Sequence, residues 1–325
     1  MENILITGIT GQDGVFLTKN LIDKNENIFI HGVSRSNDLK TLERKLMSLG
    51  VLNFTNLKIH NINLEDKKSV RKLIKTIKPD RIFNLTGPSS VYDSFSNPKK
   101  VINTITGIFD NLTETLIEEN IFVNFFQASS SEIFAPINNE SINEEAKMSP
   151  NSPYAEAKKI NHDKVSDLIE KYNWNITSGI MFNHESEFRE DNYLTSKIIK
   201  DTFDIYKNNK QEIVVGSLDY VRDWSFAGDI MKAASTLSFN NAKGPYIIGS
   251  GEGNSIKELI RIVFSYFDLD WEKYTRVDED LLRKGDPIIK ISNPYKIFKD
   301  FGWKTEMSFE DLIIRCIENK IKVME

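Results

Sequence analysis

The feature that most constrains the fold is a set of three glycines spaced three residues apart near the start of the chain, Gly8, Gly11 and Gly14. An apolar run from Asn3 to Ile6 precedes it and a helical apolar pattern follows it, so the segment reads as strand, turn and helix. In that context the glycines let backbone amides at a helix N-terminus approach a pyrophosphate without interference from Cβ atoms. The sequence therefore predicts a dinucleotide-binding α/β fold.

Strand and helix continue to alternate over the first half of the chain. Strands are expected at 28–33, 81–84, 121–126 and 176–182, with helices between them. Such alternation predicts a parallel sheet covered on both faces. We therefore expect a Rossmann doubly wound parallel sheet with a smaller C-terminal α/β substrate lobe. The Rossmann domain should span 1–182, with a return of the chain around 216–240, and 183–325 should form mainly the second lobe.

Composition narrows the range of partners and locations. The net charge of −5 comes from 42 basic and 47 acidic residues without a block of either sign, which argues against nucleic acid or a membrane surface as the partner. The N-terminus enters a strand at once without a basic leader, and no apolar run approaches the length of a bilayer span. We expect a cytoplasmic protein.

Cysteine and histidine usage bears on metal sites and disulfides. Cys316 is the only cysteine, so no intrachain disulfide can form, and its flanks place it on an amphipathic helix as a core residue. The four histidines, at 31, 60, 162 and 184, have no metal-ligand spacing with one another or with Cys316. We predict no metal.

The residue after the second strand bears on the type of dinucleotide. An Asp or Glu there would hold a ribose 2′-hydroxyl, whereas the chain has Arg35, which suits a 2′-phosphate. The alternative interpretation of Arg35 is a surface arginine on an exposed loop. The sequence favours NADP, with NAD as the alternative.

Tyr154 and Lys158 stand four residues apart in a helical pattern and therefore share one helix face. The ammonium is expected to lower the pKa of the phenol and make Tyr154 a usable base. Ser130, in a hydroxyl-rich turn after the strand predicted to end at Phe126, should lie at the ligand-binding edge of the sheet. Together with a dinucleotide loop, this set predicts hydride chemistry on a hydroxyl-bearing carbon.

Glu132 adds a carboxylate beside that set. A simple dehydrogenase does not need it, whereas a base next to a newly formed ketone can remove the acidified proton on the neighbouring carbon. Oxidation at C4 of a hexose acidifies C5–H, and its removal expels the C6 hydroxyl. The alternative interpretation is a helix-capping or solvated acid just after a strand.

These residues resemble one family closely, the extended short-chain dehydrogenase/reductases, and within them the GDP-mannose 4,6-dehydratase branch. The similarity covers nearly the whole chain. It rests on the motifs Gly8-Ile9-Thr10-Gly11-Gln12-Asp13-Gly14, His31-Gly32-Val33-Ser34-Arg35, Pro79-Asp80-Arg81-Ile82-Phe83-Asn84-Leu85, Ser130-Ser131-Glu132, Ser152-Pro153-Tyr154-Ala155-Glu156-Ala157-Lys158, Phe182-Asn183-His184-Glu185-Ser186 and Leu218-Asp219-Tyr220-Val221-Arg222-Asp223-Trp224.

The resemblance implies a lyase that oxidises a GDP-sugar at C4, dehydrates it across C5 and C6, and returns the stored hydride to C6. The implied catalytic residues are Ser130, Glu132, Tyr154 and Lys158. The implied cofactor-binding residues are Gly8, Gly11, Gln12, Asp13, Gly14, Arg35, Asn63, Leu64, Leu85, Tyr154, Lys158, Asn183 and His184. The implied substrate-binding residues are Ser89, Ser131, Asn183, Thr195, Lys197, Arg222 and Arg283.

The chain departs from the family pattern at several of these positions. Ser130 stands where the family has a threonine, and Asn63 stands where the family has the aspartate that contacts the adenine. The loop over sugar and cofactor has the altered sequence Thr86-Gly87-Pro88-Ser89. The segment Glu187-Phe188-Arg189-Glu190 adds two acids beside a nucleotide site. Substrate identity is therefore the least constrained part of the resemblance.

Three functions stay open at this point. The first is a nucleotide-sugar 4,6-dehydratase acting on GDP-mannose or a GDP-manno-heptose, which Glu132 favours. The second is a 4-dehydrogenase, 4-epimerase or 4-keto reductase on the same scaffold. The third is a dinucleotide-sensing regulator, which the intact Tyr154 and Lys158 disfavour. The family also implies a homodimer through the helices at 97–117 and 151–172, with a tetramer as the alternative.

Overall fold

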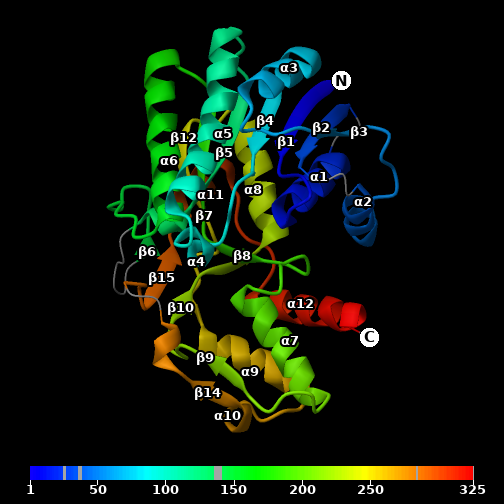
Figure 1. Ribbon diagram of the computed structural model, residues 1–325, viewed down its shortest axis with the longest axis vertical. Helices are drawn as coiled ribbons and strands as arrows, with labels where there is room; N and C mark the ends of the chain where they lie inside the picture. Colours follow the sequence, from blue (N-terminus) through cyan, green and yellow to red (C-terminus); the bar gives the residue numbers. More distant parts are fainter. Residues whose placement is uncertain (25–26, 36–38, 135–140, 283–284, 325) are drawn as a thin grey trace.

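The computed structural model describes residues 1–24, 27–35, 39–134, 141–282 and 285–324. Its centre is a seven-stranded sheet of order β12-β7-β5-β4-β1-β2-β3, and every strand pairing in it is parallel (Figure 1). The predicted Rossmann doubly wound sheet is confirmed. The strands are β1 (Glu2–Thr7), β2 (Ile28–Ser34), β3 (Leu57–Asn61), β4 (Arg81–Asn84), β5 (Asn124–Ser130), β7 (Ile176–Met181) and β12 (Gly244–Ile248).

Helices cover both faces of this sheet and bury its apolar side chains. One core forms under α1, α2, α8 and α11, and the other under α3, α5 and α6. These helices begin where the sequence supplies a capping side chain, as at Asp66, Asn97 and Ser152. Their bounds are α1 (Gln12–Lys24), α2 (Leu39–Ser48), α3 (Lys67–Ile77), α5 (Pro98–Glu118), α6 (Pro153–Tyr172), α8 (Ala227–Phe239) and α11 (Tyr295–Phe301), with the short α4 (Val91–Ser94) before α5.

The strand that carries the predicted serines is longer than expected. The apolar run suggested an end at Phe126, but β5 continues to Ser130, whose partner on β7 is Met181. The small polar side chains of this stretch are buried, so pairing with both neighbouring strands overrides their turn preference. The turn comes one residue later, as the 3₁₀ helix η1 (Ser131–Ile133).

The second lobe packs three helices around its own core and adds a small sheet of order β13-β10-β15-β6. Both α8 and β12 lie in the larger lobe, although they come from the second half of the sequence. The lobe's elements are β6 (Ser141–Ile142), β8 (Asn183–Glu185), α7 (Leu194–Tyr206), β9 (Ile213–Val215), β10 (Val221–Arg222), β11 (Trp224–Phe226), β13 (Asn254–Ser255), α9 (Ile256–Tyr266), α10 (Trp271–Tyr274), β14 (Thr275–Val277), η2 (Glu279–Leu281), β15 (Ile289–Ser292) and α12 (Phe309–Met324).

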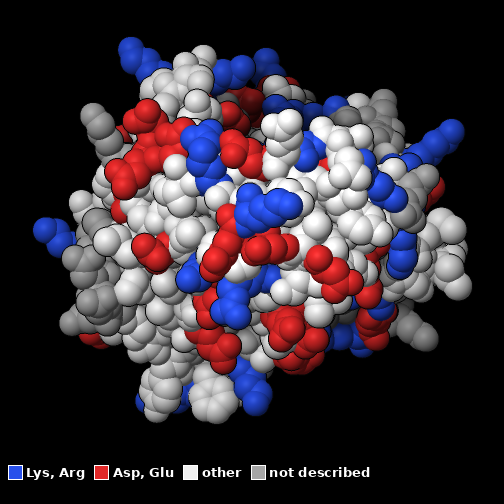
Figure 2. All heavy atoms as spheres, turned by 90° about the horizontal axis from the view of Figure 1, so that it is seen from below, with Lys and Arg blue, Asp and Glu red and all other residues white. Residues whose placement is uncertain are grey.

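The surface at the second-lobe end mixes basic and acidic side chains, which alternate over the face shown in Figure 2. Within the described ranges, no helix is long and apolar enough to cross a membrane.

Candidate active site

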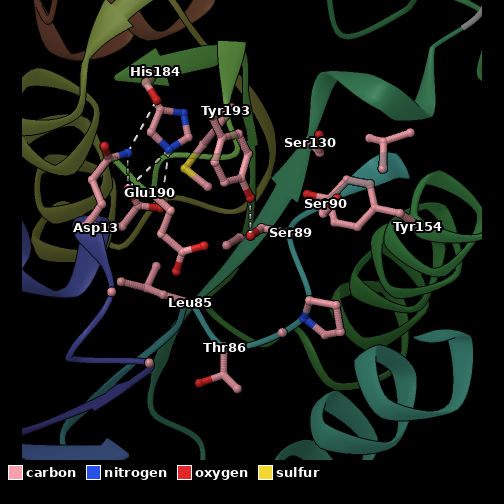
Figure 3. Close-up of a pocket in the computed structure, with 18 of the residues that line it drawn as sticks. Asp13, Leu85, Thr86, Ser89, Ser90, Ser130, Tyr154, His184, Glu190 and Tyr193 are labelled. Atoms are coloured by element: carbon pink, nitrogen blue, oxygen red, sulfur yellow. Dashed lines mark hydrogen bonds and ion pairs between the residues drawn. The ribbon is translucent and has the colours of Figure 1, made fainter. Parts of the chain in front are cut away.

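A cavity of about 1050 Å³ lies at the carboxyl ends of the parallel strands, and both lobes contribute to its wall. Asp13 and His184 lie on one side of it, and Ser130 and Tyr154 on the other (Figure 3). Ligands bind at this edge in open α/β sheets, and the volume exceeds what one drug-sized molecule needs.

The glycine loop forms one end of the cavity. Gly8 has a φ of +73°, a conformation that favours glycine, and a Cβ on Gly14 would lie 2.4 Å from the Cα of Ile9. The loop therefore brings the N-terminus of α1, which begins at Gln12, close to β1. Gly8, Gly11 and Gly14 all line the cavity, so this loop fits a pyrophosphate.

Four further residues predicted to bind the cofactor also line the cavity: Arg35, Asn63, Leu64 and Leu85. Lys45 also lines it, and its Nζ donates to the Thr10 carbonyl at 3.2 Å. No motif in the sequence marks Lys45, because its position depends on how α2 packs. Two basic side chains thus lie where one was predicted.

Ser130, Tyr154 and Lys158 are brought together on the opposite wall. Ser130 is the last residue of β5, and α6 begins one residue before Tyr154, with Ser152 accepting the Ala155 amide at 3.1 Å as its cap. Tyr154 and Lys158 are 8% and 6% exposed. The Lys158 Nζ donates to the Ala128 carbonyl at 2.9 Å and lies 5.6 Å from the Tyr154 ring centroid.

The pKa of Tyr154 is raised, not lowered as the spacing of Tyr154 and Lys158 predicted. Burial raises the pKa of the Tyr154 phenol, and the hydrogen bond with Ser130 offsets this only in part, while the negative charge of Glu132 raises it further. Burial also lowers the pKa of Lys158 to about 8, which Asp13 partly counteracts. Burial is therefore the largest influence on the pKa of both groups.

Glu132 lines the cavity next to Ser130, on η1, where its backbone amide donates to the Ser130 Oγ at 3.3 Å. Its carboxylate also pairs with Lys290, whose Nζ lies 2.6 Å from Oε1. Lys290 comes from β15 of the second lobe and was not predicted. A lysine within the apolar run Ile288–Ile291 is the sequence signal that points to it.

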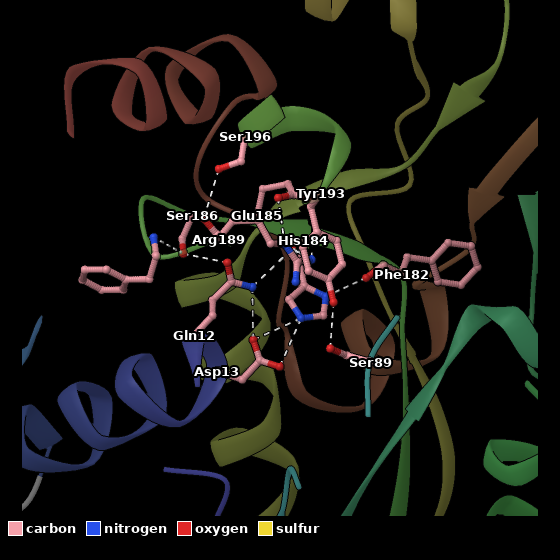
Figure 4. A network of polar contacts seen from close by, with 11 residues as sticks. Gln12, Asp13, Ser89, Phe182, His184, Glu185, Ser186, Arg189, Tyr193 and Ser196 are labelled. Carbon is pink, nitrogen blue, oxygen red and sulfur yellow. Dashed lines mark hydrogen bonds and ion pairs between the residues drawn. The ribbon is translucent and has the colours of Figure 1, made fainter. Parts of the chain in front are cut away.

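Gln12, Asp13 and His184 belong to a polar network between the glycine loop and β8 (Figure 4). The His184 Nε2 donates to Asp13 Oδ1 at 3.1 Å, and Ser186 donates to Gln12 at 2.7 Å. Burial opposes ionisation of Asp13, but the charge and hydrogen bond of His184 and the nearby Arg189 lower its pKa to about 2. Burial opposes the charged form of His184 too, yet Asp13 raises its pKa above the ordinary value.

A hydrogen bond of 2.7 Å between the hydroxyls of Ser89 and Tyr193 crosses the cavity (Figure 3). Ser89 follows β4 of the larger lobe, and Tyr193 is the residue before α7 of the second lobe. The Arg189 guanidinium lies 4.1 Å from the Tyr193 ring centroid. Glu190 also lines the cavity here.

Arg222 stands at the far end of the cavity, together with the predicted Ser131 and Asn183. Its Nη2 pairs with Asp286 at 3.0 Å, and Nη1 donates to the carbonyls of Val221 and Ile288. Both side chains of the ion pair line the cavity and are mostly buried. A guanidinium held this way has a fixed direction, as bidentate phosphate binding requires.

Two predicted substrate-binding residues, Thr195 and Lys197, are not brought to this wall. Thr195 is buried on α7 and lines a separate small pocket with Cys316 and Lys320, because its helix turns that face away from the cavity. Lys197 is exposed on α7 and does not line the cavity. Arg283 lies outside the described residues.

Comparison with known proteins places the chain in a family. A family model described as GDP-mannose 4,6 dehydratase matches residues 5–316. The chain belongs to the GDP-mannose 4,6-dehydratase family. It is 30% identical over 326 residues to GDP-mannose 4,6 dehydratase 2 of Arabidopsis thaliana, covering 98% of this chain and 87% of that one. It is 29% identical over 345 residues to the GDP-mannose 4,6 dehydratase of Homo sapiens, with 98% and 91% covered.

Solved structures share the fold of this dehydratase family member. A dTDP-glucose 4,6-dehydratase from Streptomyces venezuelae superposes with a TM-score of 0.84 at 18% identity, covering 98% of this chain and 97% of that one. A UDP-glucose 4-epimerase from Thermotoga maritima gives 0.83 at 21% identity, covering 99% and 100%. At these identities the likeness shows the fold alone.

The family assignment confirms two sequence predictions: the resemblance to GDP-mannose 4,6-dehydratases and the activity of a nucleotide-sugar dehydratase, a lyase. Epimerases among the structural neighbours fit the rival function but do not favour it over dehydration. Within the described part of the chain, no group of three or more His, Cys, Asp or Glu side chains is arranged to hold a metal ion.

Proposed function

We propose that this enzyme converts a GDP-sugar, either GDP-mannose or a GDP-manno-heptose, into the 4-keto-6-deoxy sugar nucleotide with release of water. The observation that carries this proposal is the carboxylate of Glu132 in the cavity wall beside Ser130 and Tyr154. A base in that place can reach the carbon next to the one that the tyrosine serves.

The larger lobe is proposed to hold the dinucleotide and the second lobe the nucleotide sugar. The glycine loop, Arg35 and Lys45 would bind the cofactor, and Arg222 would bind the diphosphate of the substrate. A bound nicotinamide dinucleotide would accept the hydride from C4 of the sugar and later deliver it to C6. Tyr154, once ionised, takes the C4 hydroxyl proton, with Ser130 holding that hydroxyl in place.

Glu132 then removes the C5 proton, and the electron pair of the C5–H bond forms the C5–C6 double bond as the C6–O bond breaks. The proton that Glu132 accepted leaves with the C6 oxygen as water. When C6 has been reduced, C5 takes up a proton from solvent, and Tyr154 releases to solvent the proton that it took from the C4 hydroxyl. The sugar loses one water and the cofactor ends in the state in which it began.

The raised pKa of Tyr154 needs a countercharge before the phenol can act as a base. Lys158 lies beside the ring, and its pKa of about 8 leaves it mostly charged at neutral pH. The positive charge of an oxidised nicotinamide would add to it. We infer that cofactor binding, rather than Lys158 alone, brings the phenol into its working range.

NADP is the proposed dinucleotide, with NAD as the alternative, because Arg35 and Lys45 line the adenosine end of the cavity. Arg35→Ala and Lys45→Ala should each weaken NADP binding far more than NAD binding in a titration followed by protein fluorescence. Equal effects on both would place the 2′-phosphate elsewhere. The cytoplasmic location and the homodimer through α5 and α6, with a tetramer as the alternative, stay predictions from the sequence.

The test of the function is incubation of the holoenzyme with GDP-, UDP-, CDP- and dTDP-sugars, followed by mass spectrometry. Loss of one water from a GDP-hexose without net change in NADPH absorbance is the expected result. An isomer of unchanged mass would indicate an epimerase, and consumption of NADPH a reductase. Glu132→Gln should still bind cofactor and substrate but should not exchange the C5 hydrogen with solvent.

A further inference from the structure

A buried ammonium lies directly behind the carboxylate of Glu132. The Lys290 Nζ is 2.6 Å from Glu132 Oε1, the distance of a charge-assisted hydrogen bond. The Lys290 side chain is 5% exposed and that of Glu132 is 19% exposed. Glu132 lines the cavity, whereas Lys290 is not among the described residues that do. Lys290 therefore meets the cavity only through Glu132.

The two partners are anchored on different sheets. Lys290 sits on β15, between β10 and β6; its carbonyl accepts the Asp223 amide at 3.2 Å, and Ser292, on the same face, is bound to Asp223. Glu132 sits on η1 at the end of β5. Since both backbones are fixed independently, the ion pair sets the direction of the Glu132 side chain.

The positive charge of Lys290 explains how the ion pair would help Glu132 to act as a base. A carboxylate that is largely withdrawn from water is costly unless a cation compensates it, and without one it takes up a proton. A protonated Glu132 could not accept the C5 proton. The ammonium of Lys290 favours the ionised carboxylate without occupying the cavity in which the sugar would bind.

We propose that Lys290 is a positioning residue for dehydration, which keeps Glu132 ionised and aimed at C5–H of the sugar. This inference rests on the proposed function. It assigns Lys290 to the elimination step alone, because the oxidation at C4 depends on Tyr154, Ser130 and Lys158.

A second ion pair provides the matched control. Arg315 on α12 donates through Nε to Glu187 Oε2 at 2.9 Å, and the Glu187 side chain is 4% exposed. Neither residue lines the cavity. Breaking this pair also leaves a buried carboxylate without its cation, but at residues that do not line the cavity.

The experiment resolves the two steps in single turnovers of the holoenzyme with GDP-mannose in deuterium oxide. Reduced cofactor is followed by absorbance, and deuterium at C5 and loss of water by mass spectrometry. Lys290→Met should oxidise the sugar at C4 near the wild-type rate and then accumulate reduced cofactor. Elimination and deuterium incorporation should fall by about 10²- to 10⁴-fold, the contribution typical of a general base.

Further variants separate positioning from support of the fold. Lys290→Arg should restore most of the elimination rate, because it keeps the charge. In a double-mutant cycle, Lys290→Met should have little further effect in the Glu132→Gln background, since its role passes through that carboxylate. This double variant replaces a charged pair with an uncharged one and should fold even where Lys290→Met alone is unstable. Arg315→Met should lower the melting temperature without accumulating reduced cofactor.

Equal losses in oxidation and elimination for Lys290→Met, or additive losses in the cycle, would overturn the inference, as would normal elimination in that variant. A wild-type protein that releases no water from any sugar nucleotide would instead overturn the proposed function. The two failures are thus distinguishable.

Discussion

The two walls of the cavity hold their charged groups in opposite ways. On the wall from the larger lobe, Lys158 is buried against a backbone carbonyl, beside a phenol whose pKa burial has raised. On the wall from the second lobe, each described cation faces a carboxylate: Arg222 faces Asp286 and Arg189 faces Glu185. From behind the cavity wall, Lys290 of the same lobe pairs with Glu132.

The difference corresponds to two kinds of task. A group that must gain or lose a proton works best when its environment moves its pKa, so burial without a compensating charge is useful there despite its cost in stability. A group that must bind an anion or keep one direction works best when an ion pair fixes it beforehand. The phenol and ammonium of the catalytic wall are poised by desolvation, whereas Glu132 and the cations of the binding wall are oriented by ion pairs.

Removing a poised group should have the largest effect. Tyr154→Phe is expected to lower kcat/KM by at least about 10²- to 10⁴-fold, since its phenol is the one hydrogen-bonded to Ser130. Cofactor affinity should stay near the wild-type value. The measurement is product formation by mass spectrometry together with a fluorescence titration of the cofactor. Retained turnover would move the base away from this wall.

Breaking an ion pair of the second wall should act on binding instead. Arg222→Met is expected to raise the Kd for GDP by about 10- to 100-fold, as loss of a charged hydrogen bond worth about 1.5–3 kcal/mol requires. Asp286→Asn should lower that Kd, because Asp286 competes with the diphosphate for the same guanidinium. Isothermal titration calorimetry with GDP measures both. Changes in the same direction would show that the pair is only structural.

The catalytic wall was also the more predictable from sequence. Local spacing on one helix fixes the relation between Tyr154 and Lys158, and the end of β5 brings Ser130 and Glu132 to them. The doubly wound sheet was predictable for the same reason, since strand and helix patterns are local signals.

Two of these ion pairs, Arg222–Asp286 and Lys290–Glu132, were not predictable, because they join residues that are distant in the chain. Glu132 and Lys290 are separated by 158 positions, and only the packing of β15 beside β6 brings them together. The position of Lys45 in the cavity wall was not predictable either, because its contact with Thr10 joins residues 35 positions apart. The pKa of Tyr154 was mispredicted because the spacing shows the neighbouring charge but not the burial of both groups.

The ion pair between Asp13 of the glycine loop and His184 of β8 predicts how the stability of the fold depends on pH. The Asp13 carboxylate contributes stability that is present above its ordinary pKa of 3.8 and is lost as the pH falls through about 2. The raised pKa of His184 contributes stability that is present below 6.5 and is lost as the pH rises through its folded-state value. Asp13→Asn should therefore be most destabilising between these limits.

The expected loss is on the order of 2 kcal/mol, since each pKa unit is worth about 1.4 kcal/mol. Urea unfolding of the variant and the wild type at pH 3, 5 and 9 measures this loss in the free energy of unfolding. The value of pH 5 lies between the two limits, and pH 3 and 9 lie on either side of them. A difference independent of pH would mean that the side chain acts by packing alone.

The smallest effect on kcat/KM is expected from the uncharged contact between the two lobes, the Ser89–Tyr193 hydrogen bond. The hydrogen bond between the Ser89 and Tyr193 hydroxyls is neutral and partly exposed, so Ser89→Ala and Tyr193→Phe should each cost about 0.5–1.5 kcal/mol in kcat/KM, or roughly two- to twelvefold. If the hydroxyls serve only each other, the double variant should be no worse than either single one. If Ser89 instead binds the sugar, as the sequence predicts, Ser89→Ala should exceed Tyr193→Phe and the losses should add. Steady-state kinetics of the three variants decides whether this bond joins the walls or belongs to the binding side.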